Sequence, residues 1–320
     1  MKVSLMLRGR NGGDLDVTAL TEEIVWEGRM TGQPGKLSFA LLAAEGVAFE
    51  EGAPVELTVD GKDRFSGYVF ARSRRDARRM TVTAYDQLRY FKNRDTYVLA
   101  DMSCSEIFAK VCGDFGLKHS VVHASAHVLP PKVYDDRTIG DIVQDAIDLT
   151  LAETGRRFFV RDDFGTLEHL DVAELATDLV IGDGSLMTGS LYETAIDKDS
   201  FSVVKLSRES RREEKRGMAL ARDEANTERW GVLQYYEKVK EGINDAQMRA
   251  RAEALLAQKS RVTKTLVLDA LGDWRALPGC GVWVESQQMD ERLSREMRVL
   301  AATHTLKNEL HTMRLTMEAV

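Results

Sequence analysis

Short segments of alternating apolar and polar residues limit the possible folds of this chain more than any other feature. The segment 54–59 alternates strictly, as expected for a strand with one buried face. Asp60-Gly61 follows it, a dipeptide typical of tight hairpins. Further strand-like segments lie at 23–27, 36–41, 65–70 and 80–85. Evenly spaced short strands predict a closed or nearly closed antiparallel barrel, because closure removes the exposed strand edges that would otherwise pair promiscuously.

A similar succession of strands recurs near the C-terminus. The segments 264–268, 281–285, 297–303 and 312–317 follow in the same order, and with similar spacing, as 37–41, 54–59, 65–70 and 80–85. Residue identity between the two sets is low, so two interpretations stay open. Either the chain contains a duplicated module, or two antiparallel regions resemble each other by chance. A true duplication predicts two barrels in each chain.

The middle of the chain changes character. An amphipathic segment at 106–112 ends near Gly113 or Gly116, and a second begins after Thr138, a plausible helix cap. A hairpin pattern at 157–167 follows. We therefore predict a β-dominated α+β fold with two antiparallel β-barrel modules and an α/β insertion between them. The predicted domains are 1–97, 98–198 and 199–320, the last with a charged loop at 207–228 and a helix at 245–260 packed against the barrel rim.

Composition restricts the class of protein further. Of 320 residues, 43% are hydrophobic and 30% charged, which fits a globular chain with real cores. No window approaches the roughly 18 apolar residues of a membrane span, and early charges argue against a secretory signal, so we expect cytoplasmic folding and no membrane anchor. The net charge of −7 argues against a dedicated nucleic-acid binder. The three cysteines, Cys104, Cys112 and Cys280, are expected to be buried reduced thiols.

Charge is not evenly spread along the chain, because arginine is concentrated in two segments. They supply the candidate inter-subunit or partner contacts Arg72, Arg74, Arg75, Arg78, Arg79, Arg211, Arg212 and Arg216. Runs of charge usually mark a solvated hairpin or loop. Contact with an acidic partner is the alternative. Because a DNA channel would avoid fixed positive charge, we expect the 72–79 turn to point outward or toward a neighbouring subunit.

A search for catalytic or metal-binding patterns leaves no candidate. Asp162-Asp163 with Glu168 could form a carboxylate pair for glycoside hydrolysis, but Asp-Asp-Phe-Gly is better explained as a hairpin turn. His119, His123 and His127 have helical spacing for a metal site, yet their surroundings predict a strand or loop. The sequence therefore predicts no catalytic residue, no cofactor and no metal, and a protein that is not an enzyme.

Several longer segments together resemble the PBSX-type tail hub proteins of prophages. They are Thr83 to Tyr97, Ser105-Glu106-Ile107-Phe108, Asp135 to Gln144, Phe159 to Gly165 and Asn226 to Tyr236. The resemblance runs from about residue 20 to the C-terminus. It implies a baseplate hub related to those of contractile-tailed phages, tailocins and type VI secretion spikes. Such hubs are trimers of duplicated, tail-tube-like barrels, and they offer no catalytic residues to carry over.

The expected function is therefore structural. A homotrimeric ring would adapt a sixfold tail tube to a threefold spike, in the tail or baseplate of a virion or particle assembled in the bacterial cytoplasm. The expected partners are the tail tube protein, the spike protein, the tape-measure protein and other baseplate proteins, with DNA only passing through the lumen. The alternative is a peptidoglycan-binding or wall-degrading tail protein. Its insertion would need exposed aromatic residues, and it offers only Phe108, Phe115 and Tyr134.

Overall fold

The structure is a computed structural model that describes residues 1–9, 12–42, 44, 47–74, 78–197, 199–208, 217–239, 244–287 and 292–319. It divides into two compact units, of which the larger comprises Met1–Leu191 and Leu266–Val320. The smaller unit is Tyr192–Thr265. Strands dominate the chain, as the sequence predicts.

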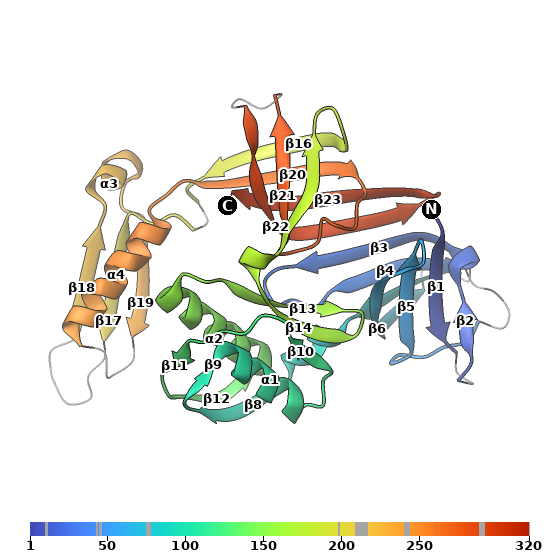
Figure 1. Cartoon of the computed structure of the whole chain (residues 1–320), viewed down its shortest axis with the longest axis horizontal. Helices are drawn as coiled ribbons and strands as arrows, with labels where there is room; N and C mark the ends of the chain where they lie inside the picture. Colours follow the sequence, from blue (N-terminus) through green and yellow to red (C-terminus); the bar gives the residue numbers. More distant parts are fainter. Residues whose placement is uncertain are drawn as a thin grey trace. The chain divides into compact units, whose positions relative to one another are not determined.

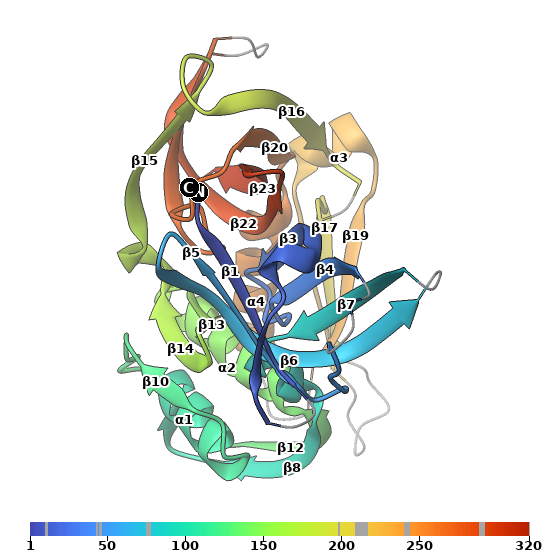
Figure 2. The ribbon, with the colours of Figure 1, turned by 90° about the vertical axis from the view of Figure 1, so that its right-hand side faces the viewer.

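One 13-stranded sheet contains strands from both ends of the chain (Figures 1 and 2). The N-terminal strand group consists of β1 (Val3–Arg8), β3 (Thr21–Arg29), β4 (Lys36–Leu42), β5 (Pro54–Val59), β6 (Lys62–Arg74) and β7 (Arg79–Tyr85). The C-terminal strand group consists of β15 (Ala176–Gly182), β16 (Met187–Ala195), β20 (Thr263–Leu271), β21 (Gly281–Ser286), β22 (Leu293–Lys307) and β23 (Leu310–Ala319). The short strand β2 (Asp14–Asp16) pairs with β1, and the 3₁₀ turn η1 (Thr18–Leu20) follows it.

The two strand groups have the same strand order. The first runs β1-β5-β6-β7-β4-β3 and the second β15-β21-β22-β23-β20-β16. Matched strands also succeed one another in the same sequence along the chain. The two groups differ in the direction of one outer strand. β1 is antiparallel to β5, whereas the matched β15 is parallel to β21.

A β-bulge recurs at the matched position in each group. The register of β6 against β7 shifts between Val69 and Ala71, and that of β22 against β23 shifts between Val299 and Ala301. A bulge bends its strand and increases its twist, so it has to be kept where the sheet must curve. Its recurrence is not expected of two unrelated antiparallel regions.

A glycine turn recurs beside each bulge. The N–H of Gly52 donates to the carbonyl oxygen of Val69 at 2.7 Å, and the N–H of Gly279 donates to that of Val299 at 2.8 Å. The reverse bond, to the residue after each glycine, is present in both groups. The two glycines have φ of +85° and +88°, a conformation that favours glycine. The two strand groups therefore share a detailed backbone design.

The two closed barrels predicted from the sequence are not confirmed. The described strands close no barrel, and the two groups join into one sheet because β22 pairs antiparallel with β3. Seven pairs, from Ala301↔Arg29 to Lys307↔Glu23, make up this junction. Pairing with β22 satisfies the hydrogen-bonding groups along the edge of β3. Closure of the N-terminal strand group into a barrel would have done the same. The strand segments predicted for each half are thus present, but they belong to one sheet.

The predicted α/β insertion lies between the two strand groups. Its elements are η2 (Gln87–Lys92), β8 (Arg94–Leu99), β9 (Met102–Ser103), α1 (Cys104–Asp114), β10 (His119–Val121), β11 (Val128–Leu129), β12 (Lys132–Thr138), α2 (Ile139–Thr154), β13 (Phe158–Asp163), β14 (Thr166–Asp171) and η3 (Val172–Glu174). Ser103 and Glu106 form a capping box at the start of α1. Thr138 caps α2, as predicted, and Gly155 ends it in the left-handed conformation.

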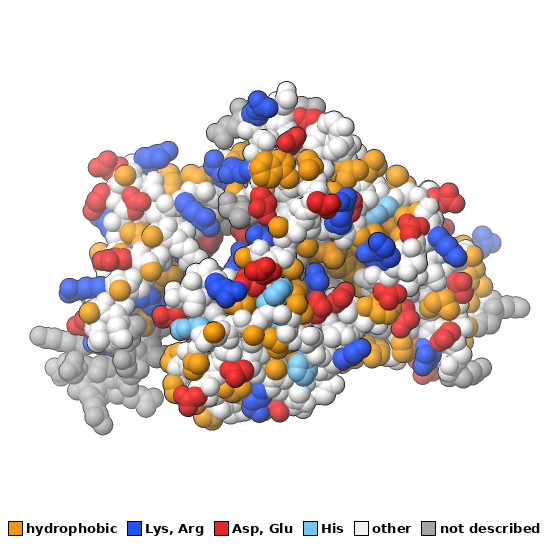
Figure 3. All heavy atoms as spheres, in the orientation of Figure 1, with side chains coloured by type: hydrophobic (Ala, Val, Ile, Leu, Met, Phe, Trp, Pro, Cys, Tyr) orange, Lys and Arg blue, Asp and Glu red, His pale blue; other side chains and the backbone are white. Residues whose placement is uncertain are grey.

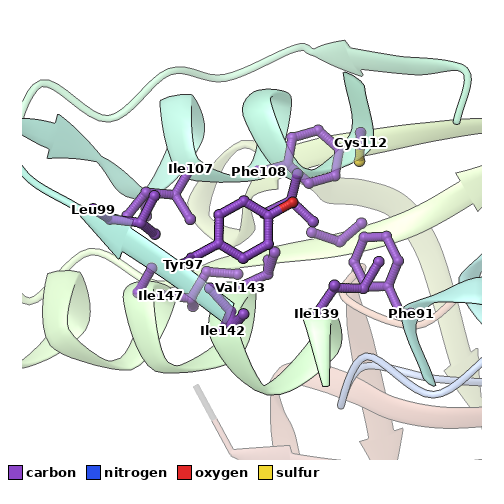
Figure 4. Close-up of a cluster of buried hydrophobic side chains, with 14 of the residues drawn as sticks. Phe91, Tyr97, Leu99, Ile107, Phe108, Cys112, Ile139, Ile142, Val143 and Ile147 are labelled. Atoms are coloured by element: carbon purple, nitrogen blue, oxygen red, sulfur yellow. The ribbon is translucent and has the colours of Figure 1, made fainter. Parts of the chain in front are cut away.

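Both helices bury their apolar faces in one core (Figure 4). Phe108 of α1 and Ile142 of α2 are fully buried in it. Tyr97 of β8 and Tyr134 of β12 complete it, and their hydroxyls donate to Asp114 at 3.0 Å and Asp145 at 2.6 Å.

The smaller unit contains a three-stranded sheet covered by a helix. Its elements are β17 (Val203–Arg208), β18 (Gly217–Arg222), α3 (Glu224–Trp230), β19 (Gln234–Val239) and α4 (Asp245–Lys259). The predicted helix at 245–260 is confirmed. It covers its own sheet rather than a barrel rim, because Met248 and Ala252 pack on Val204 and Leu206.

The predicted charged loop at 207–228 is wrong over its second half. Residues 217–222 form β18, whose Ala219 and Ala221 face α4, and Asp223 caps α3. The many charged residues next to this strand made its short alternation of apolar and polar residues hard to recognise in the sequence. Residues 209–216, with Arg211, Arg212 and Arg216, lie outside the described part of the chain.

Candidate functional site

A cavity of about 100 Å³ in the larger unit lies where the two strand groups meet the insertion. Three separate parts of the chain line it. The lining includes Trp26, Arg64 and Asp86 from the N-terminal group, Arg161, Asp162, Asp163 and Phe164 from the β13–β14 hairpin, and Trp274, Leu277 and Pro278 from the C-terminal region. The cavity therefore lies where all three parts of the larger unit meet.

Asp86 is the most deeply buried carboxyl at this junction. Its Oδ2 accepts from the N–H of Gly35 at 2.7 Å, and its Oδ1 accepts from the N–H of Leu88 at 3.0 Å. The second bond caps η2. Burial raises the pKa of Asp86 well above its usual range, and the nearby Asp162 charge raises it further. Asp86 thus fixes the β3–β4 turn against the start of the insertion.

Asp162 approaches Asp86 from the β13–β14 hairpin. Its Oδ1 accepts from the N–H of Gly165 at 2.6 Å, and its Oδ2 accepts from the N–H of Gln87 at 3.2 Å. The Gln87 side-chain amide also donates to the Gly165 carbonyl oxygen. Burial raises the pKa of Asp162 to about 6 despite these bonds, and the two carboxyls titrate as a coupled pair.

The pair predicts a measurable pH dependence of stability. Because the folded pKa of Asp162 lies above its unfolded value, its stabilising contribution is complete below about pH 4 and is lost as the pH rises through 6. We expect Asp162→Asn to flatten the pH dependence of the unfolding free energy between pH 4.5 and 7.5 by on the order of 1–3 kcal/mol. Denaturant titrations at each pH measure it.

Asp163 provides the matched control for this prediction. It is exposed on the same hairpin. Because the Asp163 charge adds to the effect of burial in raising the pKa of Asp162, Asp163→Asn should reduce the pH dependence of stability, but by clearly less than Asp162→Asn. Equal profiles for the unchanged chain and Asp162→Asn would contradict the assignment.

An aromatic and imidazole cluster lies behind the cavity lining at Trp26 and Trp274. Trp274 stacks on His304 with ring centroids 4.3 Å apart, and Trp26 meets Trp274 edge-on at 5.9 Å. The Nδ1 of His304 lies 2.9 Å from the Nε2 of His311. Burial lowers the pKa of His304 to about 3, so this imidazole stays neutral near pH 7. Trp26 comes from β3 and His304 from β22, so the cluster holds the strands that join the two groups.

Two polar atoms in the cavity lining have no hydrogen-bond partner among the described residues. They are the Nε of Arg64 and the Nε1 of Trp274. The Arg64 guanidinium lies over the Trp274 ring at 5.2 Å from its centroid, a cation–π contact. The described lining thus mixes donors with carboxyls, and it contains no Ser, Thr or Cys side chain that could act as a nucleophile.

The interpretation of Asp162-Asp163 as part of a hairpin turn is confirmed. Asp162 binds backbone amides at the β13–β14 turn, where Phe164 and Gly165 have φ of +45° and +82°. Glu168 forms an ion pair with Arg161 at 3.0 Å. Sequence reasoning missed the approach of Asp86 to Asp162. The one local signal was the Asp-Gln-Leu pattern of a helical cap after β7.

The other sequence candidates are dispersed. His119 lies on β10, so His119, His123 and His127 do not share a helix face. Within the described ranges, no group of three or more His, Cys, Asp or Glu side chains is arranged to hold a metal ion. All three cysteines are buried, and burial raises the pKa of Cys112 to about 12, which makes it unreactive.

The arginines of the first cluster gather at the β6–β7 hairpin. Arg72 pairs with Glu51 at 2.8 Å and its guanidinium lies over the Phe49 ring, while Arg79 pairs with Glu22 at 2.8 Å. Arg74 and Arg78 are exposed, and Arg75 lies outside the described residues. Lysines, arginines and acidic side chains are interspersed over the face drawn in Figure 3.

Solved structures with a similar architecture include a prophage tail protein and a component of the type VI secretion system. The 43 kDa tail protein of prophage MuSo2 from Shewanella oneidensis superposes with a TM-score of 0.75, at 12% identity, over 99% of this chain and 98% of its own. The E. coli c3393 protein, a component of the type VI secretion system, superposes with a TM-score of 0.58, at 10% identity, over 99% of this chain and 76% of its own. The chain therefore has a phage-tail protein fold.

Sequence comparison agrees with the structural one. The phage-like element PBSX protein XkdQ of Bacillus subtilis is 29% identical over 301 residues, 92% of this chain and 91% of its own, which confirms the predicted PBSX-type resemblance. In the described parts of the chain, no helix has the length and apolar character to cross a membrane. The profile of the YqbQ-like family matches residues 24–318, so a fold shared with tail proteins and a match along nearly the whole chain establish that it belongs to the YqbQ-like family.

Proposed function

We propose that the chain is a structural hub of a phage tail or contractile injection particle, in which three copies close a ring between the tail tube and the spike. The observation that carries this proposal is the repeated strand group, with its bulge and glycine turn at matched positions. Two matched groups per chain allow three chains to present six similar modules around one axis. Closed rings of this kind use heterologous interfaces whose rotation closes.

The same proposal assigns the partners and the place of action. The sixfold face would meet the tail tube protein, and the threefold face the spike protein and other baseplate proteins. The lumen would hold the tape-measure protein and then pass DNA or an effector. The ring would assemble in the host cytoplasm and act in the tail or baseplate. The predicted domains 1–97 and 199–320 would supply the duplicated tube-like modules, and 98–198 the insertion. The bounds need one correction, because β15 and β16 within 98–198 belong to the C-terminal strand group and residues 192–265 form the smaller unit.

Copy number is the decisive measurement. Native mass spectrometry of the purified chain, followed by electron microscopy of the intact particle, should give three copies around the axis. Because an interface of this kind buries on the order of 2,000–5,000 Å², the trimer should persist on dilution to micromolar concentration. Six copies around the axis, or a monomer both alone and in the particle, would contradict the proposal.

The peptidoglycan-binding alternative loses its structural support. Phe108 is fully buried and Tyr134 is 7% exposed, both in the core of the insertion, and Phe115 packs against that core. Phe108 and Tyr134 are therefore not presented for stacking on a sugar ring, and Phe115 is only partly exposed. Retention of the purified chain on peptidoglycan would restore this alternative. A trimer that passes through without retention supports the hub.

A further inference from the structure

The joint between the two strand groups provides a template for a joint between chains. In β22, residues before the bulge pair with β21 on one side, and residues 301–307 after the bulge pair with β3 on that side. One long strand thus serves first its own group and then the neighbouring one. The partner of β22 on this side changes from β21 to β3 at the bulge.

The bulge divides the matched strand β6 in the same way, but among the described strands its second part has no partner on that flank. Before its bulge it pairs with β5, ending at Pro54↔Tyr68. After the bulge, residues 71–74 pair with β7, and no other described strand lies on their second flank. By the repeat, this flank corresponds to the flank of β22 that β3 occupies.

The described residues of the segment before β5 contact this part of β6 through the Arg72 side chain. Arg72 binds Glu51 and the Phe49 carbonyl oxygen there. The segment before β21 does the same in the C-terminal group, where the Nε2 of His304 lies 3.2 Å from the Ala276 carbonyl oxygen. That contact coexists with β3 pairing along β22. The Arg72 contact is therefore compatible with a strand beside β6.

The strand that matches β3 is β16, and it also lacks a second neighbour. It lies at one end of the sheet, and β20 is its one paired strand among those described. Its Leu191 is 58% exposed. An edge strand that carries an exposed large apolar side chain is prone to pair with another chain unless something covers it.

We infer that β16 of one copy adds to the open flank of β6, at residues 71–74, in the next copy, repeating between chains the antiparallel β3–β22 joint within the chain. This inference rests on the proposed ring. The charges agree with it, because Arg74 is exposed on β6 and Glu193 is exposed on β16. The contact is heterologous, as closure of a ring requires.

Directed cross-linking tests the contact between chains. Ser73 on β6, Ser190 on β16 and Ser294 on β22 are all exposed, and the native cysteines are buried. Ser73→Cys and Ser190→Cys chains are mixed and treated with a short bismaleimide. A covalent dimer containing one chain of each kind is expected. Ser294→Cys replaces Ser190→Cys in the control, which should give no such dimer.

A matched pair of leucine variants gives an independent readout. Leu191 and Leu310 are 58% and 54% exposed, and both lie in strands of the C-terminal group. Leu191→Lys should weaken trimer association about tenfold or more, as expected for a charge placed in an interface core. The melting temperature of the dissociated chain, measured at concentrations too low for association, should not change. Leu310→Lys should leave both unchanged.

The outcomes separate this inference from the proposed ring. A trimer that forms without the Ser73–Ser190 cross-link, and that tolerates Leu191→Lys, overturns the strand contact and leaves the ring. A chain that stays monomeric alone and in the particle overturns both. Capture of β16 by a different tail protein, detected as a cross-link to that protein in the intact particle, also overturns the contact.

Discussion

Replacing Phe108 with alanine should lower the free energy of unfolding by about 3–5 kcal/mol. Phe108 is a fully buried residue of α1 in the insertion core (Figure 4). Its ring centroid lies 5.5 Å from that of His169. The neighbouring backbone belongs to capped helices and paired strands, so the core has little freedom to collapse into the cavity. Chemical denaturation followed by circular dichroism measures the change.

Phe115→Ala is the control for this prediction. Phe115 packs at the margin of the same core and is partly exposed. Its removal should cost clearly less than that of Phe108. Equal losses for the two variants would mean that the packing of this core differs from that described.

Gly279→Ala should destabilise the chain by about 2–5 kcal/mol, while Gly52→Ala should cost about 1–2 kcal/mol. The two glycines hold matched turns with nearly equal positive φ, so both variants incur backbone strain. They differ in surroundings. A Cβ at Gly279 would lie 2.4 Å from the Phe159 ring, whereas a Cβ at Gly52 would meet nothing within 4 Å.

The additional steric cost of Gly279→Ala arises because the Phe159 ring cannot move aside. Phe159 is buried in a small cluster with Met30, Leu170 and Val172. The difference between the two alanine variants therefore isolates overpacking from strain. Thermal unfolding of both, with Phe159→Leu added to Gly279→Ala, measures it. A failure of Phe159→Leu to recover part of the loss in Gly279→Ala would contradict the steric explanation.

Local sequence patterns predicted most of the elements but not how they join. The alternation at 54–59 and the helix formers at 245–260 specify a strand and a helix from within a few residues. The β3–β22 junction depends on pairing between segments at opposite ends of the chain, and alternation alone does not select a partner. Two barrels and one fused sheet require the same alternation in each strand.

The candidate site shows the same limit. The turn formed by Asp162 and Gly165 was predictable, because its residues are adjacent in the sequence. The proximity of Asp86 was not, since each carboxyl separately looks like an ordinary cap or turn residue. The coupled titration of the two groups arises from the fold that brings β7 and β13 together.

The smaller unit leaves and re-enters the larger one through β16 and β20, and these strands are neighbours in the sheet. A segment attached at two adjacent points can be exchanged, enlarged or shortened without changing the order of the strands around it. Selection could therefore adapt residues 192–265 to different neighbours in different particles, while the sheet that carries the joints between modules stays constant. A single scaffold would then serve many machines whose surroundings differ.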